Sequence, residues 1–371
     1  IYGVDGSYTH ESGLITRMID KLPLLDTKEK STITVSAEGA RLDPGHSRAI
    51  GKGDEGQVYI DDFEGTQSTY DLKFPYSAWV LASTPTGGLF PYSDSINNLQ
   101  YGFRRAKLNW YSIDPLFLRN LSSTPEYIKD NKSEQCSFYT REVSELEIFP
   151  NKQSATPLLT SIATFDLNYE PNVKGPYNFE TNGLTGTDNL GRIHFSNPET
   201  HWGGIMRSID YNDFEQANIE YIQLWVLDPY LDGYAGNTYG SLNIDLGSIS
   251  EDILKDSRLF TENGLPVNGD PSSANLDQTS WSMISVNIPP TNSFDNQESA
   301  RQFQDVGYDG VGAPQNPPAG AILETDFDAP YLNLLSATYG SGSAIYQKAQ
   351  QDPAQDNYHY YLGSDYDADQ V

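Results

Sequence analysis

Short apolar runs that alternate with polar residues and end at turn residues constrain the fold of this chain most. Alternating runs cover 32–37, 143–149, 161–169, 241–247 and 282–288, and a nearly continuous apolar run covers 218–227. Gly, Pro and Asn separate the runs. Many short strands with turns between them are typical of a sandwich or a jelly roll. We therefore predict a mainly β chain, with a jelly-roll or β-sandwich domain, short helices and long loops.

The patterns suggest three parts. In 1–57, only the run Thr32–Ala37 alternates clearly, which predicts a single strand from the edge of a larger sheet. The many strand patterns place the jelly-roll-like domain at 58–290. In 291–371 the periodicity is weak and Gly, Pro, Asp and Gln are frequent, so we expect long loops that pack on a larger protein.

Two segments carry helix signals. Asp114 followed by Pro115 provides an N-cap and a first-turn proline, which predicts a helix near 114–120. In 249–259, Ser250 is a candidate N-cap with two acids in the first turn after it.

The charge balance narrows the possible partners. The chain has 51 acidic and 23 basic residues, a net charge of −28 at pH 7. This charge repels a phosphate backbone, so we expect no nucleic-acid partner. Carboxylates are typical ligands of calcium, so calcium is the candidate cation. The alternative is that most of these acids only keep the protein soluble. Cys136 is the only cysteine, which excludes an intrachain disulfide and a cysteine-based metal cluster.

Catalytic motifs are missing from the sequence. Asp61 and Asp62 are neighbours on a predicted strand, so their side chains point to opposite faces and cannot act as a glycosidase pair. A glycosidase would need two carboxylates brought together from distant positions. No nucleophile elbow, P-loop or dinucleotide fingerprint is present. We expect a protein that is not an enzyme.

Two acidic segments are candidates for binding a cation. Asp305 and Asp309, with Gly310 after the second, resemble half of a calcium loop, although the remaining ligands of an EF-hand are absent. The alternative is a simple Asp-Gly turn. The acids of the last segment either bind a cation or a partner, or belong to a solvated loop. We favour the solvated loop. These acids are Asp352, Asp356, Asp365, Asp367 and Asp369.

The five tryptophans are candidates for a sugar-stacking platform. Trp225 lies in the most apolar run and is predicted to be in the core. Trp202 precedes Gly203 and Gly204 and is the candidate for exposure, whereas the core is favoured for most of the five.

Several segments in fixed order resemble one protein family. The segments are 20–24 (DKLPL), 58–65 (VYIDDFEG), 138–150 (FYTREVSELEIFP), 202–207 (WGGIMR), 213–227 (DFEQANIEYIQLWVL), 248–254 (SISEDIL), 261–266 (TENGLP), 304–310 (QDVGYDG) and 358–367 (YHYYLGSDYD). Together they span nearly the whole chain and resemble the SprA/Sov family, the giant outer-membrane translocon of the type IX secretion system.

The resemblance implies a fold, a location and partners. SprA-like proteins are large, non-enzymatic outer-membrane β-barrels with inserted cap domains, which export type IX substrates, including gliding adhesins. The chain would then be an internal fragment, a jelly-roll domain flanked by pieces of a larger β-barrel on the cell-surface side. The implied partners are the rest of that barrel, a PorV-like outer-membrane protein, a plug protein and the secreted substrates. Ile1 is no initiator Met and no signal peptide follows it, as expected for a fragment.

A more distant likeness concerns the predicted domain alone. The segments IDDFEG (60–65) and DFEQANIEYIQLWV (213–226) resemble jelly-roll carbohydrate-binding modules. In those modules the Glu of the first strand is often a structural calcium ligand, which points to Glu64. The metal prediction is therefore calcium at Glu64, Asp305 and Asp309. The alternative function is a surface carbohydrate-binding module.

Overall fold

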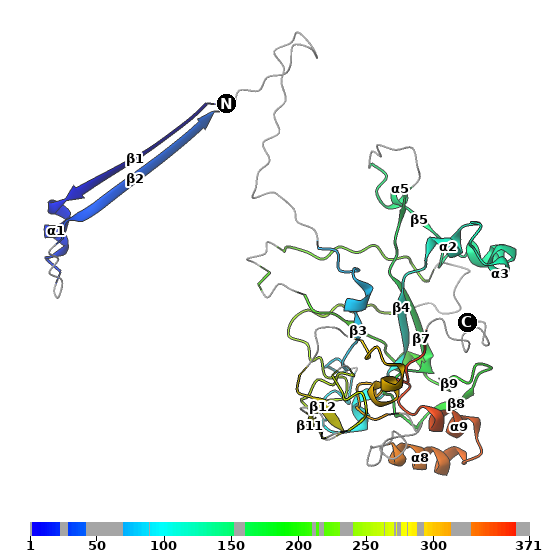
Figure 1. Cartoon of the computed structure of the whole chain (residues 1–371). Coiled ribbons are helices and arrows are strands. Elements are labelled where there is room, and N and C mark those ends of the chain that lie inside the picture. Colours follow the sequence, from blue (N-terminus) through cyan, green and yellow to red (C-terminus); the bar gives the residue numbers. More distant parts are fainter. Residues whose placement is uncertain are drawn as a thin grey trace, which may run out of the picture. The chain divides into compact units, whose positions relative to one another are not determined.

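The protein is seen in a computed structural model as two compact units, Ile1–Asp71 and Leu72–Val371 (Figure 1). The structure describes residues 2–22, 29–41, 70–88, 90–151, 160–209, 213–214, 219–230, 240–262, 264–270, 272, 276–279, 281–287, 293–312 and 328–360. The predicted strand that carries Asp61 and Asp62 lies outside these residues, as does Glu64.

The first unit is a two-stranded antiparallel ribbon. Strand β1 (Tyr2–Ser12) pairs with β2 (Ser31–Arg41) along their full lengths, with Tyr8 opposite Val35. Helix α1 (Gly13–Ile19) follows β1 directly. The strand predicted at 32–37 is confirmed, because it lies inside β2.

The second unit contains small antiparallel sheets. The largest has the order β4-β7-β9-β8, with β4 at Ala106–Tyr111, β7 at Asp166–Lys174, β8 at Leu184–Thr187 and β9 at Ile193–Phe195. The two-stranded pairs are β3 (Val80–Leu81) with β10 (Ile205–Met206), β5 (Val143–Ser144) with β6 (Ser161–Ile162), and β11 (Leu276–Gln278) with β12 (Met283–Ser285). Among the described residues no sheet closes into a barrel. The β class of the prediction is confirmed at this coarse level.

Short helices connect and cover these sheets. They are α2 (Pro115–Leu118), α3 (Glu126–Asp130), α4 (Lys132–Gln135), α5 (Glu145–Ile148), α6 (Arg301–Gln304), α8 (Ala329–Tyr339) and α9 (Ala344–Gln351), with 3₁₀ turns at Tyr76–Ala78, Leu99–Gly102, Pro198–Thr200 and Glu298–Ala300. Among the described residues, no helix has the length and apolar character needed to cross a membrane.

Helices α8 and α9 lie side by side at the β8–β9 end of the large sheet (Figure 1). Leu335 and Ile345 from these helices share one buried core with Ile193 of β9 and Leu254. The prediction of long loops for 291–371 is therefore wrong at α6, α8 and α9. Residues on both sides of the predicted boundary at 290 contribute to the same core.

Three strand predictions are wrong in extent. Only Val143–Ser144 of the run 143–149 is a strand, and helix α5 follows it. The run 161–169 is broken between β6 and β7, so its apolar residues do not share one continuous strand face. The run 282–288 is a strand only at β12.

The most apolar run departs most from the prediction. In its described part, 219–227, no strand forms, and Trp225 is 63% exposed rather than in the core. Residues 241–247 likewise form no strand, and Leu242, Ile244 and Leu246 are exposed. Alternation predicts a strand only when a partner strand takes up the backbone hydrogen bonds.

The two helix predictions have opposite outcomes. Helix α2 is confirmed: the Asp114 side chain accepts the N–H of Leu116 at 2.8 Å, and Pro115 is its first residue. Residues 249–259 form no helix, because the Asp252 carboxylate binds the N–H groups of Asp256 and Ser257 in a local turn.

Candidate functional site

The β1–β2 ribbon has two chemically different faces. One face carries Val4, Gly6, Tyr8 and His10 from β1 with Ile33, Val35, Ala37 and Gly39 from β2. The stacked rings of Tyr8 and His10, with centroids 6.1 Å apart, lie on this face. The other face carries Asp5, Ser7, Thr9 and Glu11 with Thr32, Thr34, Ser36 and Glu38. The hydroxyls of Thr9 and Thr34 meet there at 3.3 Å.

Among the described residues of the first unit, nothing covers the apolar face of the ribbon. Val4 is 76% exposed and Tyr8 64%, and Val35 is 56% exposed. Among the described residues each strand pairs only with the other, so both outer edges present backbone groups to the surroundings. An isolated two-stranded ribbon is at most marginally stable in water, so this element is built to gain further contacts.

A buried group of acids surrounds the loop that follows α6 in the second unit. The Asp305 carboxylate accepts the N–H of Tyr358 at 3.0 Å, and Asp309 accepts the N–H of Val311 at 2.9 Å. Asp309 is fully buried. Gly307 and Gly310 have positive φ angles of 57° and 76°, which let the backbone turn tightly in this loop.

Two further acids approach this loop from other segments. Glu262 accepts the N–H of Gly307 at 2.9 Å. A carboxylate oxygen of Asp356 lies against Gly307, next to the phenol of Tyr177, which itself accepts the N–H of Tyr308 at 2.8 Å. The loop is thus fixed by side chains that lie up to 131 residues away in the sequence.

Burial dominates the acid strength of this group. It raises the pKa of Glu262 to about 7, although the hydrogen bond from Gly307 opposes the shift. Burial, reinforced by the nearby charge of Asp352, raises the pKa of Asp356 well above its usual value. Burial also raises the pKa of Asp305, against the bond from Tyr358. A carboxyl with the raised pKa of Glu262 takes up a proton near neutral pH.

The predicted calcium ligands lie only partly within the described residues. Asp305 and Asp309 bind different backbone N–H groups, and Glu64 lies outside the described residues. In the part of the chain that the structure describes, no three Asp, Glu, His or Cys side chains converge closely enough to hold a metal ion. Calcium at Glu64, Asp305 and Asp309 stays a prediction.

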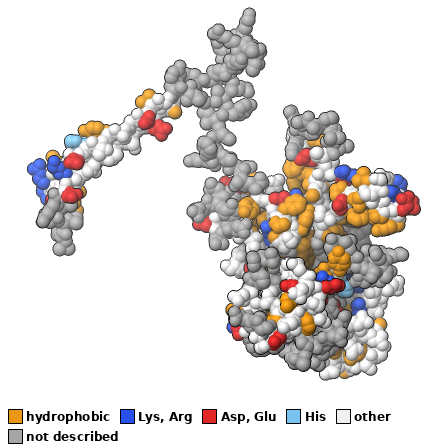
Figure 2. Space-filling view, in the orientation of Figure 1, with side chains coloured by type: hydrophobic (Ala, Val, Ile, Leu, Met, Phe, Trp, Pro, Cys, Tyr) orange, Lys and Arg blue, Asp and Glu red, His pale blue; other side chains and the backbone are white. Residues whose placement is uncertain are grey.

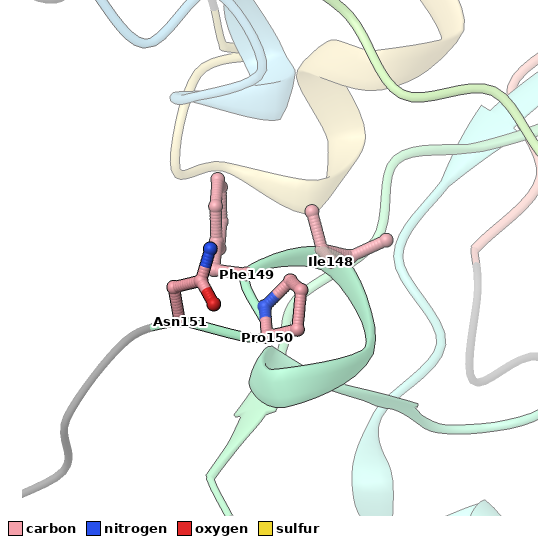
Figure 3. Close-up of a pocket in the computed structure, with 4 residues that line it drawn as sticks. All are labelled: Ile148, Phe149, Pro150 and Asn151. Carbon is pink, nitrogen blue, oxygen red and sulfur yellow. The ribbon is translucent and has the colours of Figure 1, made fainter.

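The tryptophans do not form the predicted pattern. Trp281 is buried, whereas Trp79, Trp110 and Trp202 are half-buried. Trp225 is the most exposed and meets Phe149 edge-on, with ring centroids 6.4 Å apart. An open hollow of about 530 Å³ lies beside Phe149, lined by Ile148, Phe149, Pro150 and Asn151 (Figure 3).

The comparisons with known proteins provide no family assignment. No protein-family model matches the chain, and no curated protein matches it.

Sequence reasoning missed several residues of the acid group. Glu262 and Tyr177 carried no local signal, because they reach the loop only through the fold. Asp352 and Asp356 were noted in the acidic last segment, but the favoured interpretation of a solvated loop is wrong for the buried carboxylate of Asp356. Asp365, Asp367 and Asp369 lie outside the described residues.

Proposed function

We propose that the chain is part of an outer-membrane protein translocon of the SprA/Sov type, which exports proteins in type IX secretion and serves gliding motility. The observation that carries the proposal is the two-faced β1–β2 ribbon. In this proposal, its strands span the outer membrane side by side, and the second unit belongs to the cap on the cell-surface side.

Strand length supports the membrane assignment. Each strand has 11 residues. A tilted strand needs about 9–11 residues to cross the hydrocarbon core of a bilayer. A two-stranded ribbon needs further packing partners to be stable in water, and neighbouring membrane strands would supply them.

The face pattern supports the same assignment. Strands of membrane barrels alternate between an apolar lipid face and a polar lumen face. Here the acids Asp5, Glu11 and Glu38 all lie on the polar face. The apolar face carries no acid, and Arg41 stands at its end. Neighbouring barrel strands would take up the backbone groups at the two open edges.

The second unit has a structural role in this proposal. We expect a jelly-roll sandwich completed by its surroundings, in which the exposed segments 219–228 and 240–246, which form no strand here, find strand partners. No bond-making residue is assigned. Its surface would meet the rest of the barrel, a PorV-like protein, a plug protein or the exported substrate.

Charge insertion on the two ribbon faces tests the proposal. In the organism that makes the protein, the double variant Tyr8→Lys/Val35→Lys would place cations toward lipid, at a cost of about 2–4 kcal/mol each near the membrane centre. The matched variant Ser7→Lys/Ser36→Lys would place them in the lumen. We expect loss of outer-membrane protein and of type IX export for the first pair only. Equal behaviour of both pairs would contradict membrane-spanning strands.

A carbohydrate-binding module is the second candidate, favoured by the exposed Trp225 beside Phe149 and the open hollow. Aromatic rings that stack on sugars need such exposure. A glycan array would test it, with Trp225→Ala as the variant and Tyr127→Ala, a more exposed aromatic on α3, as the control. Binding that Trp225→Ala alone abolishes would support this candidate. No binding by the parent would exclude it for the glycans tested.

A further inference from the structure

Helix α1 carries an uncovered apolar row. Leu14 and Met18 are four residues apart, so they lie on the same side of the helix, and each is 62% exposed. Leu22 follows four residues later in the turn after α1 and is 56% exposed. A row of three large side chains this exposed is unusual in water and indicates a surface that is covered in the working protein.

The opposite side of α1 is fixed to the ribbon. Thr16 is buried, its hydroxyl donates to the carbonyl oxygen of Ser12 at 3.2 Å, and it accepts the N–H of Ser31 at 2.7 Å. Thr16 is two residues from both Leu14 and Met18, about half a turn around the helix. The anchored side and the apolar row therefore face in opposite directions.

Two cations flank the apolar row. Arg17 and Lys21 are exposed, four residues apart, and stand next to Met18 and Leu22 in the sequence. Figure 2 shows Lys and Arg side chains gathered at the α1 end of the ribbon. The chain as a whole has a net charge of −28, and the half-buried Asp20 lies between these two cations in the sequence. Long cationic side chains beside apolar ones match the boundary between lipid phosphates and acyl chains.

We propose that α1 and the turn after it lie on an anionic phospholipid surface, with Leu14, Met18 and Leu22 among the acyl chains and Arg17 and Lys21 at the phosphates. This rests on the proposed function, because α1 joins one end of the ribbon, where a membrane-spanning pair of strands would meet the headgroups. The helix fixes which end of the ribbon reaches the phospholipid surface.

Site-specific fluorescence on the full-length chain tests the proposal. Cys136 is replaced by Ser, and a polarity-sensitive dye is attached to Met18→Cys or to the control Glu29→Cys, a nearby exposed position. Vesicles contain phosphatidylethanolamine with phosphatidylglycerol, or phosphatidylcholine alone. We expect a blue shift at position 18, quenched by spin-labelled acyl chains, and none at position 29. Equal spectra at the two positions would overturn the proposal.

A charge variant tests the phosphate contacts. Arg17→Gln/Lys21→Gln should lower partitioning into the phosphatidylglycerol vesicles by roughly tenfold or more and change binding to phosphatidylcholine little. An unchanged partition would overturn the role of the two cations. A blue shift that grows with protein concentration without vesicles would also overturn the proposal, because a second copy would then be the occupant.

A third dye position separates this proposal from the proposed function. The dye on Val35→Cys reports the apolar face of the ribbon. Quenching at position 35 but not at 18 would overturn the helix proposal and leave the membrane strands supported. Quenching at 18 alone would support the helix and contradict the strands. No quenching at either position would overturn both.

Discussion

The backbone N–H of Gly307 donates to a carboxylate oxygen of Glu262 across 2.9 Å. The same glycine has a φ of 57° and lies against the carboxylate of Asp356 and the phenol of Tyr177. One residue thus ties three segments of the second unit together, and its backbone shape and its lack of a side chain are both required.

Gly307→Ala should destabilise the second unit severely. The added Cβ would clash with the Asp356 carboxylate and come within 2.7 Å of the Tyr177 hydroxyl, in addition to the cost of the left-handed backbone. We expect about 3 kcal/mol or more, measured by chemical denaturation.

Gly340→Ala is the matched control. Gly340 also has a positive φ, 89°, but open space around it. It should cost only about 1 kcal/mol, the backbone contribution alone. Equal losses in the two variants would show that the contacts of Gly307 carry no energy.

Glu262→Gln should stabilise the protein at pH 8 by about 2 kcal/mol. The folded-state pKa of Glu262 is about 7, above that of an unfolded glutamate. The folded protein therefore binds a proton more readily, and stability contributed by this group is lost as the pH rises toward 7 and beyond. The gain in the variant should vanish near pH 4. Denaturation midpoints across this range measure it, with the exposed Glu298→Gln as control.

Asp188→Asn should show the opposite pH dependence. Burial alone would raise the pKa of Asp188, but hydrogen bonds from His194 at 3.0 Å and from Arg192 at 2.6 Å hold it well below the usual range. The stabilisation is present above the unfolded pKa and is lost as the pH falls through the folded one. We expect a loss of about 1 kcal/mol at pH 7, limited by solvent screening.

The difference between Asp188→Asn and the parent should shrink below about pH 4, near the pKa of an unfolded aspartate. Glu199→Gln, an exposed acid on the turn Pro198–Thr200, serves as the control. A loss that stays constant down to pH 2 would contradict the ionic nature of the Asp188 contacts.

Local chemistry was predictable from the sequence, and tertiary placement was not. The cap of α2 at Asp114 and the alternating strand within β2 depend on neighbours in sequence, and both predictions are confirmed. The apolar run around Trp225 had the pattern of a core strand, but among the described residues it has no strand partner.

The candidate site shows the same limit. Asp305 and Asp309 were found through the glycine that follows the second acid. Two further acids, Glu262 and Asp356, lie against the same loop. They are 43 residues before Asp305 and 47 residues after Asp309 in the sequence. To predict that the ribbon has an apolar and a polar face, both β1 and β2 would have to be recognised as strands. The sequence showed alternation only in β2, because the glycines and His10 of β1 interrupt the apolar pattern.

Cysteine accessibility along the ribbon tests the central claim most directly. In a Cys136→Ser background, single cysteines at Val4, Tyr8, Ile33 and Val35 are compared with single cysteines at Ser7, Thr9, Thr34 and Ser36 in intact outer membranes, using a water-soluble maleimide. The account predicts that only the second set is labelled, and that both sets are labelled after denaturation. Equal labelling of the two sets in intact membranes would contradict a membrane-spanning ribbon.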